Sequence, residues 1–182
     1  MERKKMWIGG KWVEAESGQT FTVLNPSTEE ELGRVPLGGV ADVDKAVKAA
    51  NSAFPVWSKM LQSERAKLID KLADLLRKNA DTLVPLEINE HGTPKAMAAG
   101  GLEMAAGLLE YTASISRALM GQVIPVLPNT LSYLQRVPLG VCASIVPWNG
   151  VYHMMVDLFA AALVVGNTCI IIRCINNNHA YF

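Results

Sequence analysis

One asparagine amide stands where an α/β protein could use it for chemistry. Asn149 follows the segment 141–146, whose six small or apolar residues suit a buried strand. Pro147 has no N–H for a neighbouring strand, so the strand should end there, and Asn149 and Gly150 then offer a turn before an apolar helical run. Ligands of open α/β sheets lie outside the carboxyl ends of the strands. Asn149 is therefore a candidate ligand-binding group, with turn shaping as its alternative role.

Three cysteines are the candidates for nucleophilic chemistry. Cys142 and Cys169 fall inside expected strands, where a buried thiol packs as a small apolar side chain. Cys174 follows Arg173, whose charge favours a thiolate, but no base or oxyanion partner accompanies it. An odd cysteine count without disulfide-like spacing predicts a reducing, cytoplasmic setting. The histidines have no metal-ligand spacing with the cysteines, so no metal site is expected.

The charge balance argues against two classes of partner. Seventeen Lys and Arg cancel seventeen Asp and Glu, and no basic patch predicts binding to nucleic acid or to a membrane surface. The most apolar stretch, 151–172, is interrupted by Asp157, Gly166 and Asn167, which favours a core helix and a strand over a membrane span. The charged N-terminus leads into no long apolar run, which argues against a signal peptide.

Two β-hairpins should open the chain. The first spans residues 6–13, and its central Gly9 and Gly10 supply the positive φ angles that a two-residue turn needs. The second has strands at 20–25 and 31–37. The simplest interpretation is that both hairpins have a structural role and carry no chemistry.

Three helices should follow, each marked by apolar residues at three- and four-residue steps. The predicted apolar faces are Val43, Ala46, Val47, Ala50, Phe54 and Trp57 in the first, Ile69, Leu72, Ala73, Leu76, Ala80 and Leu83 in the second, and Met97, Gly101, Met104, Leu108, Tyr111, Ile115 and Leu119 in the third.

The helix boundaries are predicted from capping and breaking residues. Pro55 should end the first helix. Ser63 should cap the second, and Pro85 should break or kink it. Gly92 is a left-handed stop, after which Thr93-Pro94 should provide the cap and first turn of the third helix.

The last third of the chain predicts a βαβ unit. Residues 131–137 are strand-like, and 141–146, 151–165 and 168–172 predict a strand, a helix and a parallel strand. The second parallel strand is apolar throughout, which predicts a sheet covered on both faces. Its outer edge should stay open, because residues 174–182 have no pattern that continues the fold.

Several segments, in matching order and spacing, resemble the aldehyde dehydrogenase superfamily. They are Trp7-Ile8-Gly9-Gly10-Lys11-Trp12, Asn25-Pro26-Ser27-Thr28, Ala53-Phe54-Pro55-Val56-Trp57, the turn Arg136 to Gly140, Ile145-Val146-Pro147-Trp148-Asn149 and Gly166-Asn167-Thr168. Pro-Trp-Asn alone is a weak motif, whereas the whole series over about residues 6–171 is specific. Full members of that family are much longer, so the chain resembles their N-terminal portion, cut within the cofactor-binding domain.

The resemblance implies oxidation of an aldehyde to a carboxylic acid with NAD or NADP. In the family a cysteine thiolate attacks the carbonyl, hydride passes to the nicotinamide, and water hydrolyses the thioester. By resemblance, Asn149 is the side-chain donor to the oxyanion, a kind of contact worth on the order of 10²- to 10³-fold in rate. Ile145, Val146, Pro147 and Trp148 would line the cofactor, with plain core packing as the alternative for Trp148.

The sequence departs from the family pattern in two places. A proline usually stands two residues after the asparagine, where this chain has Val151. The lysine that binds the cofactor ribose in the family falls at Ile172, and Arg173 comes one residue later. A shift of one residue turns a strand side chain to the opposite face, so Arg173 replaces that lysine only if the backbone bulges. Arg173 is kept as a candidate ribose contact.

The predicted fold class is therefore α/β, with N-terminal β-hairpins and a helical layer leading into the first βαβ unit of an incomplete, Rossmann-like parallel sheet. The expected division within residues 1–182 is hairpins at 6–40, helices at 41–121, a hairpin strand and the βαβ unit at 131–173, and a divergent tail at 174–182.

Three functional hypotheses follow. The first is an aldehyde dehydrogenase fragment that is inactive alone, because the family's nucleophilic cysteine, general-base glutamate and Gly-rich cofactor turn lie beyond the matched residues. The second is a non-catalytic interaction or oligomerisation fragment that binds full-length relatives, since hairpin edges invite strand addition; the family commonly forms homo-oligomers. The third, a partial nucleotide binder, is weaker because the G-x-G-x-x-G fingerprint is absent.

Overall fold

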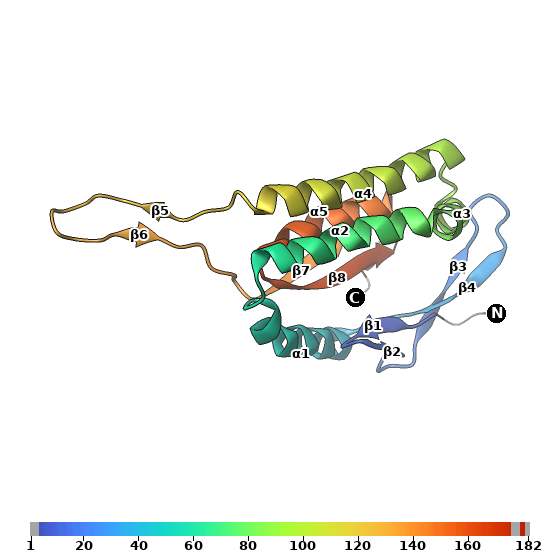
Figure 1. Cartoon of the computed structure of the whole chain (residues 1–182). Coiled ribbons are helices and arrows are strands. Elements are labelled where there is room, and N and C mark those ends of the chain that lie inside the picture. Colours follow the sequence, from blue (N-terminus) through green and yellow to red (C-terminus); the bar gives the residue numbers. More distant parts are fainter. Residues whose placement is uncertain (1–3, 176–178, 181–182) are drawn as a thin grey trace.

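A parallel pair of strands lies between two helical layers (Figure 1). The computed structural model describes residues 4–175 and 179–180. Helices α2, α4 and α5 cover one face of the pair β7–β8, and α1 covers the other. In chain order the elements are β1 (Met6–Ile8), β2 (Lys11–Val13), β3 (Thr20–Leu24), β4 (Glu31–Pro36), α1 (Val40–Trp57), α2 (Gln62–Lys78), α3 (Ala80–His91), α4 (Lys95–Ser116), β5 (Gln122–Val123), β6 (Tyr133–Leu134), β7 (Val141–Val146), α5 (Val151–Val164), β8 (Thr168–Ile175) and β9 (His179–Ala180).

Both predicted N-terminal hairpins are present. Ile8 pairs with Lys11 across a two-residue turn, in which Gly9 and Gly10 have φ angles of 59° and 77°. Strands β3 and β4 form the second antiparallel pair. These hairpins lie beside α1, at the end of the molecule where α3 also lies (Figure 1).

Two predicted helix boundaries in the first half of the helical layer were wrong. Pro55 lies inside α1, which continues to Trp57. Only two residues of α1 follow the proline, so little helix depends on the hydrogen bond that it removes. Ser63 does not cap α2, because the helix begins at Gln62, after Leu61, without a side-chain cap hydrogen bond.

The break in the second predicted helix lies at Asn79 and not at Pro85. The Asn79 amide donates to the Leu75 carbonyl at 2.7 Å and satisfies an acceptor at the end of α2, after which α3 begins at Ala80 with Pro85 inside it. Gly92 ends α3 with φ 69°, as predicted. Thr93 is not a cap, since Pro94 is the residue that precedes α4 and makes no side-chain cap hydrogen bond.

The predicted apolar face of α4 was also wrong. Met97, Met104 and Tyr111 are exposed, each by 60% or more. The buried face is instead made of mostly small residues, namely Ala98, Leu102, Ala105, Ala106, Leu109, Thr112, Ala113 and Ser116. Small side chains let α4 approach α2 and α5 closely, and periodicity alone does not distinguish two apolar stripes on one helix.

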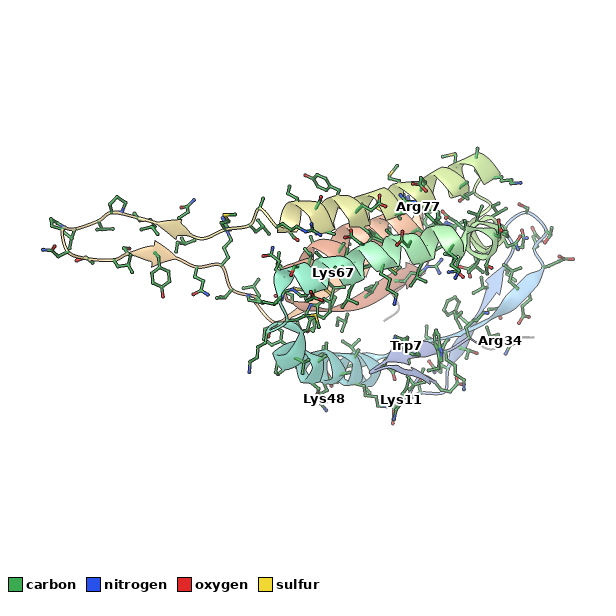
Figure 2. All side chains as sticks on the ribbon, viewed as in Figure 1. Trp7, Lys11, Arg34, Lys48, Lys67 and Arg77 are labelled. Carbon is green, nitrogen blue, oxygen red and sulfur yellow. The ribbon has the colours of Figure 1, made fainter. Side chains whose placement is uncertain are left out.

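An ion-pair cluster links the exposed sides of α2 and α4. Arg77 on α2 donates to Glu103 on α4, with Nη2 2.7 Å from Oε1, and also to Glu110. Figure 2 shows Arg77 on the side of α2 that faces α4, whereas Lys67 extends toward solvent. Exposed pairs of this kind contribute little to stability, so the helical layer is held mainly by its core.

The predicted βαβ unit is present, with α5 joining the parallel strands β7 and β8. Ile170 and Ile172 pack against α1, and Cys169 packs on the α5 side, so both faces are covered at the start of β8. Within the described residues the outer edge of Thr168 to Ile172 is unpaired, as expected, and the short strand β9 pairs only with Cys174 and Ile175. Residues 176–178 and 181–182 of the predicted divergent tail lie outside the described residues.

A long two-stranded arm extends away from the body, to the left in Figure 1. Only Tyr133 and Leu134 of the predicted strand 131–137 are in strand conformation, and they pair with Gln122 and Val123. The arm leaves large apolar side chains exposed, namely Val123, Val126, Leu127, Leu131, Tyr133 and Val137, each by more than 60%. Within the described residues, no helix is long and apolar enough to cross a membrane.

Candidate functional site

The Asn149 amide lies at the carboxyl end of the parallel strands. Strand β7 ends at Val146, residues 148–150 form a bend, and α5 begins at Val151. The Asn149 side chain is exposed and makes no hydrogen bond within the described part of the chain. An asparagine that shapes a turn bonds its own nearby backbone. The amide N–H groups are therefore available to an outside acceptor.

Gly150 holds the bend against the first turn of α5. Its φ is 62° and its ψ is 45°, a left-handed conformation that favours glycine. A Cβ at this position would lie 2.3 Å from Cε1 of His153. The glycine thus permits both the backbone turn and the close approach of the His153 ring beside Asn149.

Asn167 fixes the entry into β7. Its Oδ1 accepts hydrogen bonds from the backbone N–H groups of Leu139 at 2.7 Å and Gly140 at 3.0 Å. Asn167 itself is buried. One amide oxygen therefore ties the turn before β7 to the turn before β8, and keeps the two strand starts together.

The two strand residues next to the bend point to opposite faces of the sheet. Ile145 pairs with Ile172 on the face that α1 covers, and Val146 pairs with Arg173 on the other face. Ile145 is 60% exposed, whereas Val146 is 1% exposed. A ligand at this edge can touch the Ile145 side chain, while Val146 offers only its backbone.

Arg173 lies on the face opposite Ile172, as the register argument predicted. Ile172 is buried against α1. The Arg173 guanidinium reaches the end of α3, where Nη1 donates to Oε2 of Glu90 at 3.1 Å and Nη2 lies 3.3 Å from Nε2 of His91. The His91 ring in turn meets the Trp148 ring edge-on, with centroids 5.8 Å apart. The end of β8 is thereby connected to the bend that carries Asn149.

Sequence reasoning missed the acidic groups of α3 that surround this edge. Glu87 is 7% exposed, and its Oε2 has no hydrogen-bond partner among the described residues. Burial raises the pKa of the Glu87 carboxyl, against the charges of His153 and Arg173, which lower it. The only sequence signal was a run of polar residues before Gly92, which is typical of any helix end.

The first turn of α5 is anchored to α3 by Tyr152. Its hydroxyl donates to the Leu83 carbonyl at 2.8 Å. Burial and then the charge of Glu87 raise the pKa of Tyr152 to about 12, so the phenol keeps its proton at neutral pH. This anchor holds α5 and the bend before it in place.

The Cys169 thiol is not activated as a nucleophile. Burial raises the pKa of the Cys169 thiol to about 11, and Cys142 stands beside it in the neighbouring strand. A protonated, half-buried thiol is unreactive. The Cys174 side chain lies outside the described residues. No group of three or more His, Cys, Asp and Glu in the described part of the chain could hold a metal ion.

A groove lies between α4 and α5. Its lining is mostly apolar and consists of Met104, Gly107, Leu108, Tyr111, His153 and Asp157. His153 belongs to both the groove and the first turn after Asn149. The edge of the sheet and the groove therefore form one candidate site.

This chain is similar in sequence to known proteins. The profile described as "Aldehyde dehydrogenase family" matches residues 12–172. Mouse "Aldehyde dehydrogenase, cytosolic 1" is 38% identical over 175 residues, which cover 94% of this chain and 35% of that protein. Human "Aldehyde dehydrogenase 1A1" is 39% identical over 173 residues, covering 92% of this chain and 34% of that protein.

Solved structures give the same result. PnpE, crystallised "in complex with Nicotinamide adenine dinucleotide", superposes with a TM-score of 0.91 at 36% identity, covering 93% of this chain and 35% of that one. The NAD+ complex of aldehyde dehydrogenase from Bacillus cereus gives 0.89 at 38% identity, with the same coverage. The chain thus spans about a third of the length of the relatives it matches. Sequence and fold agree, and the chain belongs to the aldehyde dehydrogenase family.

Proposed function

We propose that this chain supplies the oxyanion donor of an oxidoreductase that converts an aldehyde to a carboxylic acid with NAD or NADP. The observation that carries the proposal is the free, exposed Asn149 amide at the carboxyl end of β7. A neutral amide that bonds nothing in the ground state can donate to the negative charge that develops on a carbonyl oxygen.

The residues at the same edge fit one side of a dinucleotide cofactor. Ile145 and Trp148 expose apolar surface there, and the first N–H groups of α5 have no side-chain cap. We propose that Ile145, Val146, Pro147 and Trp148 line the cofactor, Val146 through its backbone. Arg173 is not part of this lining, because the β7–β8 register has no bulge and its side chain lies on the face opposite Ile145 and Ile172. The cofactor supplies the hydride acceptor.

The aldehyde substrate would enter along the groove between α4 and α5. Its apolar lining suits the hydrocarbon part of an aldehyde. His153, which lines the groove, lies in the first turn of α5, just after Asn149. We further propose a cytoplasmic location, which the cytosolic mouse relative supports.

The chain by itself is expected to show no turnover, because it offers a free amide while burial keeps the Cys169 thiol protonated, and the family's nucleophilic cysteine lies beyond the matched residues. The experiment is a chimera in which residues 12–172 replace the matching segment of the Bacillus cereus enzyme, which is 38% identical. We expect the chimera to form NADH with a panel of simple aldehydes, followed by absorbance, and the isolated chain to form none.

Two results would contradict this proposal. NADH formation by the isolated chain would mean that a nucleophile exists within it. A chimera that folds, by circular dichroism and size exclusion, but shows no turnover would mean that the Asn149 edge of this chain does not support the chemistry.

A second candidate function is an interaction fragment that binds full-length relatives. The observation that favours it is the β5–β6 arm, whose apolar side chains are exposed over most of its length. An apolar patch of this kind on a projecting hairpin is typical of protein–protein contact sites. The same arm could join two copies of this chain into a homo-oligomer.

Mixing the chain with full-length human aldehyde dehydrogenase 1A1 tests this function. We expect co-elution on size exclusion, and loss of co-elution in Leu131→Asp, because a charge would be desolvated at the contact. Leu131 is 77% exposed on the arm, and Leu68→Asp on α2, at 46% exposed, is the matched control that should still co-elute. Equal behaviour of both variants would count against the arm as the contact.

A further inference from the structure

One imidazole contacts both side chains that flank the proposed cofactor edge. Nε2 of His91 lies 3.3 Å from Nη2 of Arg173 at the end of β8. The same ring packs edge-on against Trp148, at an interplanar angle of 64°. The other side of the guanidinium is held by Glu90 at 3.1 Å. The end of α3 thus bridges two segments that are 25 residues apart in sequence.

The chemistry of the contact fixes the proton on the ring. An arginine guanidinium has only donors, so Nε2 of His91 must accept and carry no hydrogen. A neutral imidazole then has its proton on Nδ1. We propose that His91, as the neutral Nδ1–H tautomer, is a positioning residue that orients Arg173 and the Trp148 ring at the cofactor edge. The importance of this role for cofactor binding rests on the proposed function, whereas the contacts of His91 with Arg173 and Trp148 do not.

The surrounding charges determine when the bridge exists. Glu90 on α3 and Arg173 on β8 act on the His91 ring. Glu87 on α3 lies near Arg173 and near His153 of α5. Burial lowers the pKa of His91 below its ordinary value of 6.5, the Arg173 charge lowers it further, and Glu90 raises it. Protonation would place a hydrogen on Nε2, facing the guanidinium donors. The bridge is therefore complete at pH 7 and is lost as the pH falls through the lowered pKa of His91.

Nitrogen NMR on the full wild-type chain tests the proton position directly. Long-range ¹H–¹⁵N spectra at pH 8 should show an unprotonated, pyridine-like Nε2 and a protonated Nδ1 for His91, assigned by its absence in His91→Gln. An Nε2–H tautomer would overturn the proposal without the need for any folded variant.

The indole N–H signals test the connection to Trp148. The chain has four tryptophans, and Trp148→Phe identifies the relevant signal. This signal should shift as the pH is lowered, with a midpoint below 6.5 and equal to that of the His91 ring. The Trp57 indole, which donates to the Leu163 carbonyl at 2.9 Å, is the internal control and should not follow this titration.

Two variants separate positioning from plain packing. His91→Gln retains an acceptor for Arg173 but does not titrate, so the Trp148 signal should stay at one position across the pH range, shifted from wild type by the loss of the ring. His91→Phe keeps an aromatic edge but no acceptor for Arg173. The Trp148 signal of this variant should therefore differ from that of the wild-type chain at all pH values. Unchanged titration of Trp148 in His91→Gln would refute the bridge. Adding NAD to the same sample tests the proposed function separately, because a chain that does not bind NAD can still show the titration of the Trp148 signal.

Discussion

Replacing Asn149 by alanine in the chimera should lower kcat/KM for aldehyde oxidation on the order of 10²- to 10³-fold, or about 2.7 to 4 kcal/mol of transition-state stabilisation. The side chain is exposed and bonds nothing in the described residues, so its loss leaves the fold unchanged. The loss should fall mainly on kcat, because the amide bonds an oxygen that becomes negative only during the reaction.

The control for this experiment is Asn51→Ala, which removes an exposed amide from α1. It should leave both kcat and KM unchanged. Steady-state NADH formation with purified chimeras checks both variants. A fall of less than about threefold for Asn149→Ala, roughly 0.6 kcal/mol, would mean that the amide does not face the reacting oxygen.

Replacing Arg65 by methionine should lower the free energy of unfolding of this chain by about 3 kcal/mol. Arg65 on α2 is 7% exposed, and its Nε donates to the Val164 carbonyl at 3.0 Å. Its Nη1 donates to the carbonyls of Trp57 and Met60. The guanidinium thus satisfies acceptors at the ends of α1 and α5 at once, and methionine would leave them unpaired in the interior.

The same residue connects the helical layer to the sheet. The Arg65 guanidinium packs beneath Gly166, the turn that leads from α5 into β8. Urea unfolding followed by circular dichroism measures the effect, and Lys67→Met is the matched control, because Lys67 is exposed on the same helix. Lys67→Met should change the free energy of unfolding by less than about 0.5 kcal/mol. Equal effects of the two substitutions would show that the Arg65 hydrogen bonds are not needed.

Local features were predicted well where the backbone conformation or hydrogen bonding of a single residue determines them. The Gly9–Gly10 turn, the left-handed stop at Gly92 and the end of β7 at Pro147 all follow from φ preferences or a missing N–H. The helix starts at Ser63 and Thr93 were misplaced, because capping residues occur in many contexts and no capping hydrogen bond formed at either.

The packing face of α4 could not be predicted in the same way. Large apolar residues such as Met104 and Tyr111 favoured one stripe, yet the small residues around Ala105 and Ala106 are buried. Burial depends on how closely two helices approach, and that distance is a property of the pair. The predicted break at Pro85 was also misplaced, because α2 already ends at Asn79.

The amino-acid sequence by itself determined the family, the βαβ unit and the position of Asn149 after β7, because these rest on local order along the chain. Only the tertiary structure decided that His91 and Glu90 of α3 meet Arg173 of β8, and that His91 also meets Trp148. These contacts join residues up to 83 positions apart. No local pattern encodes them, since side chains from separate elements become neighbours only when the layers pack.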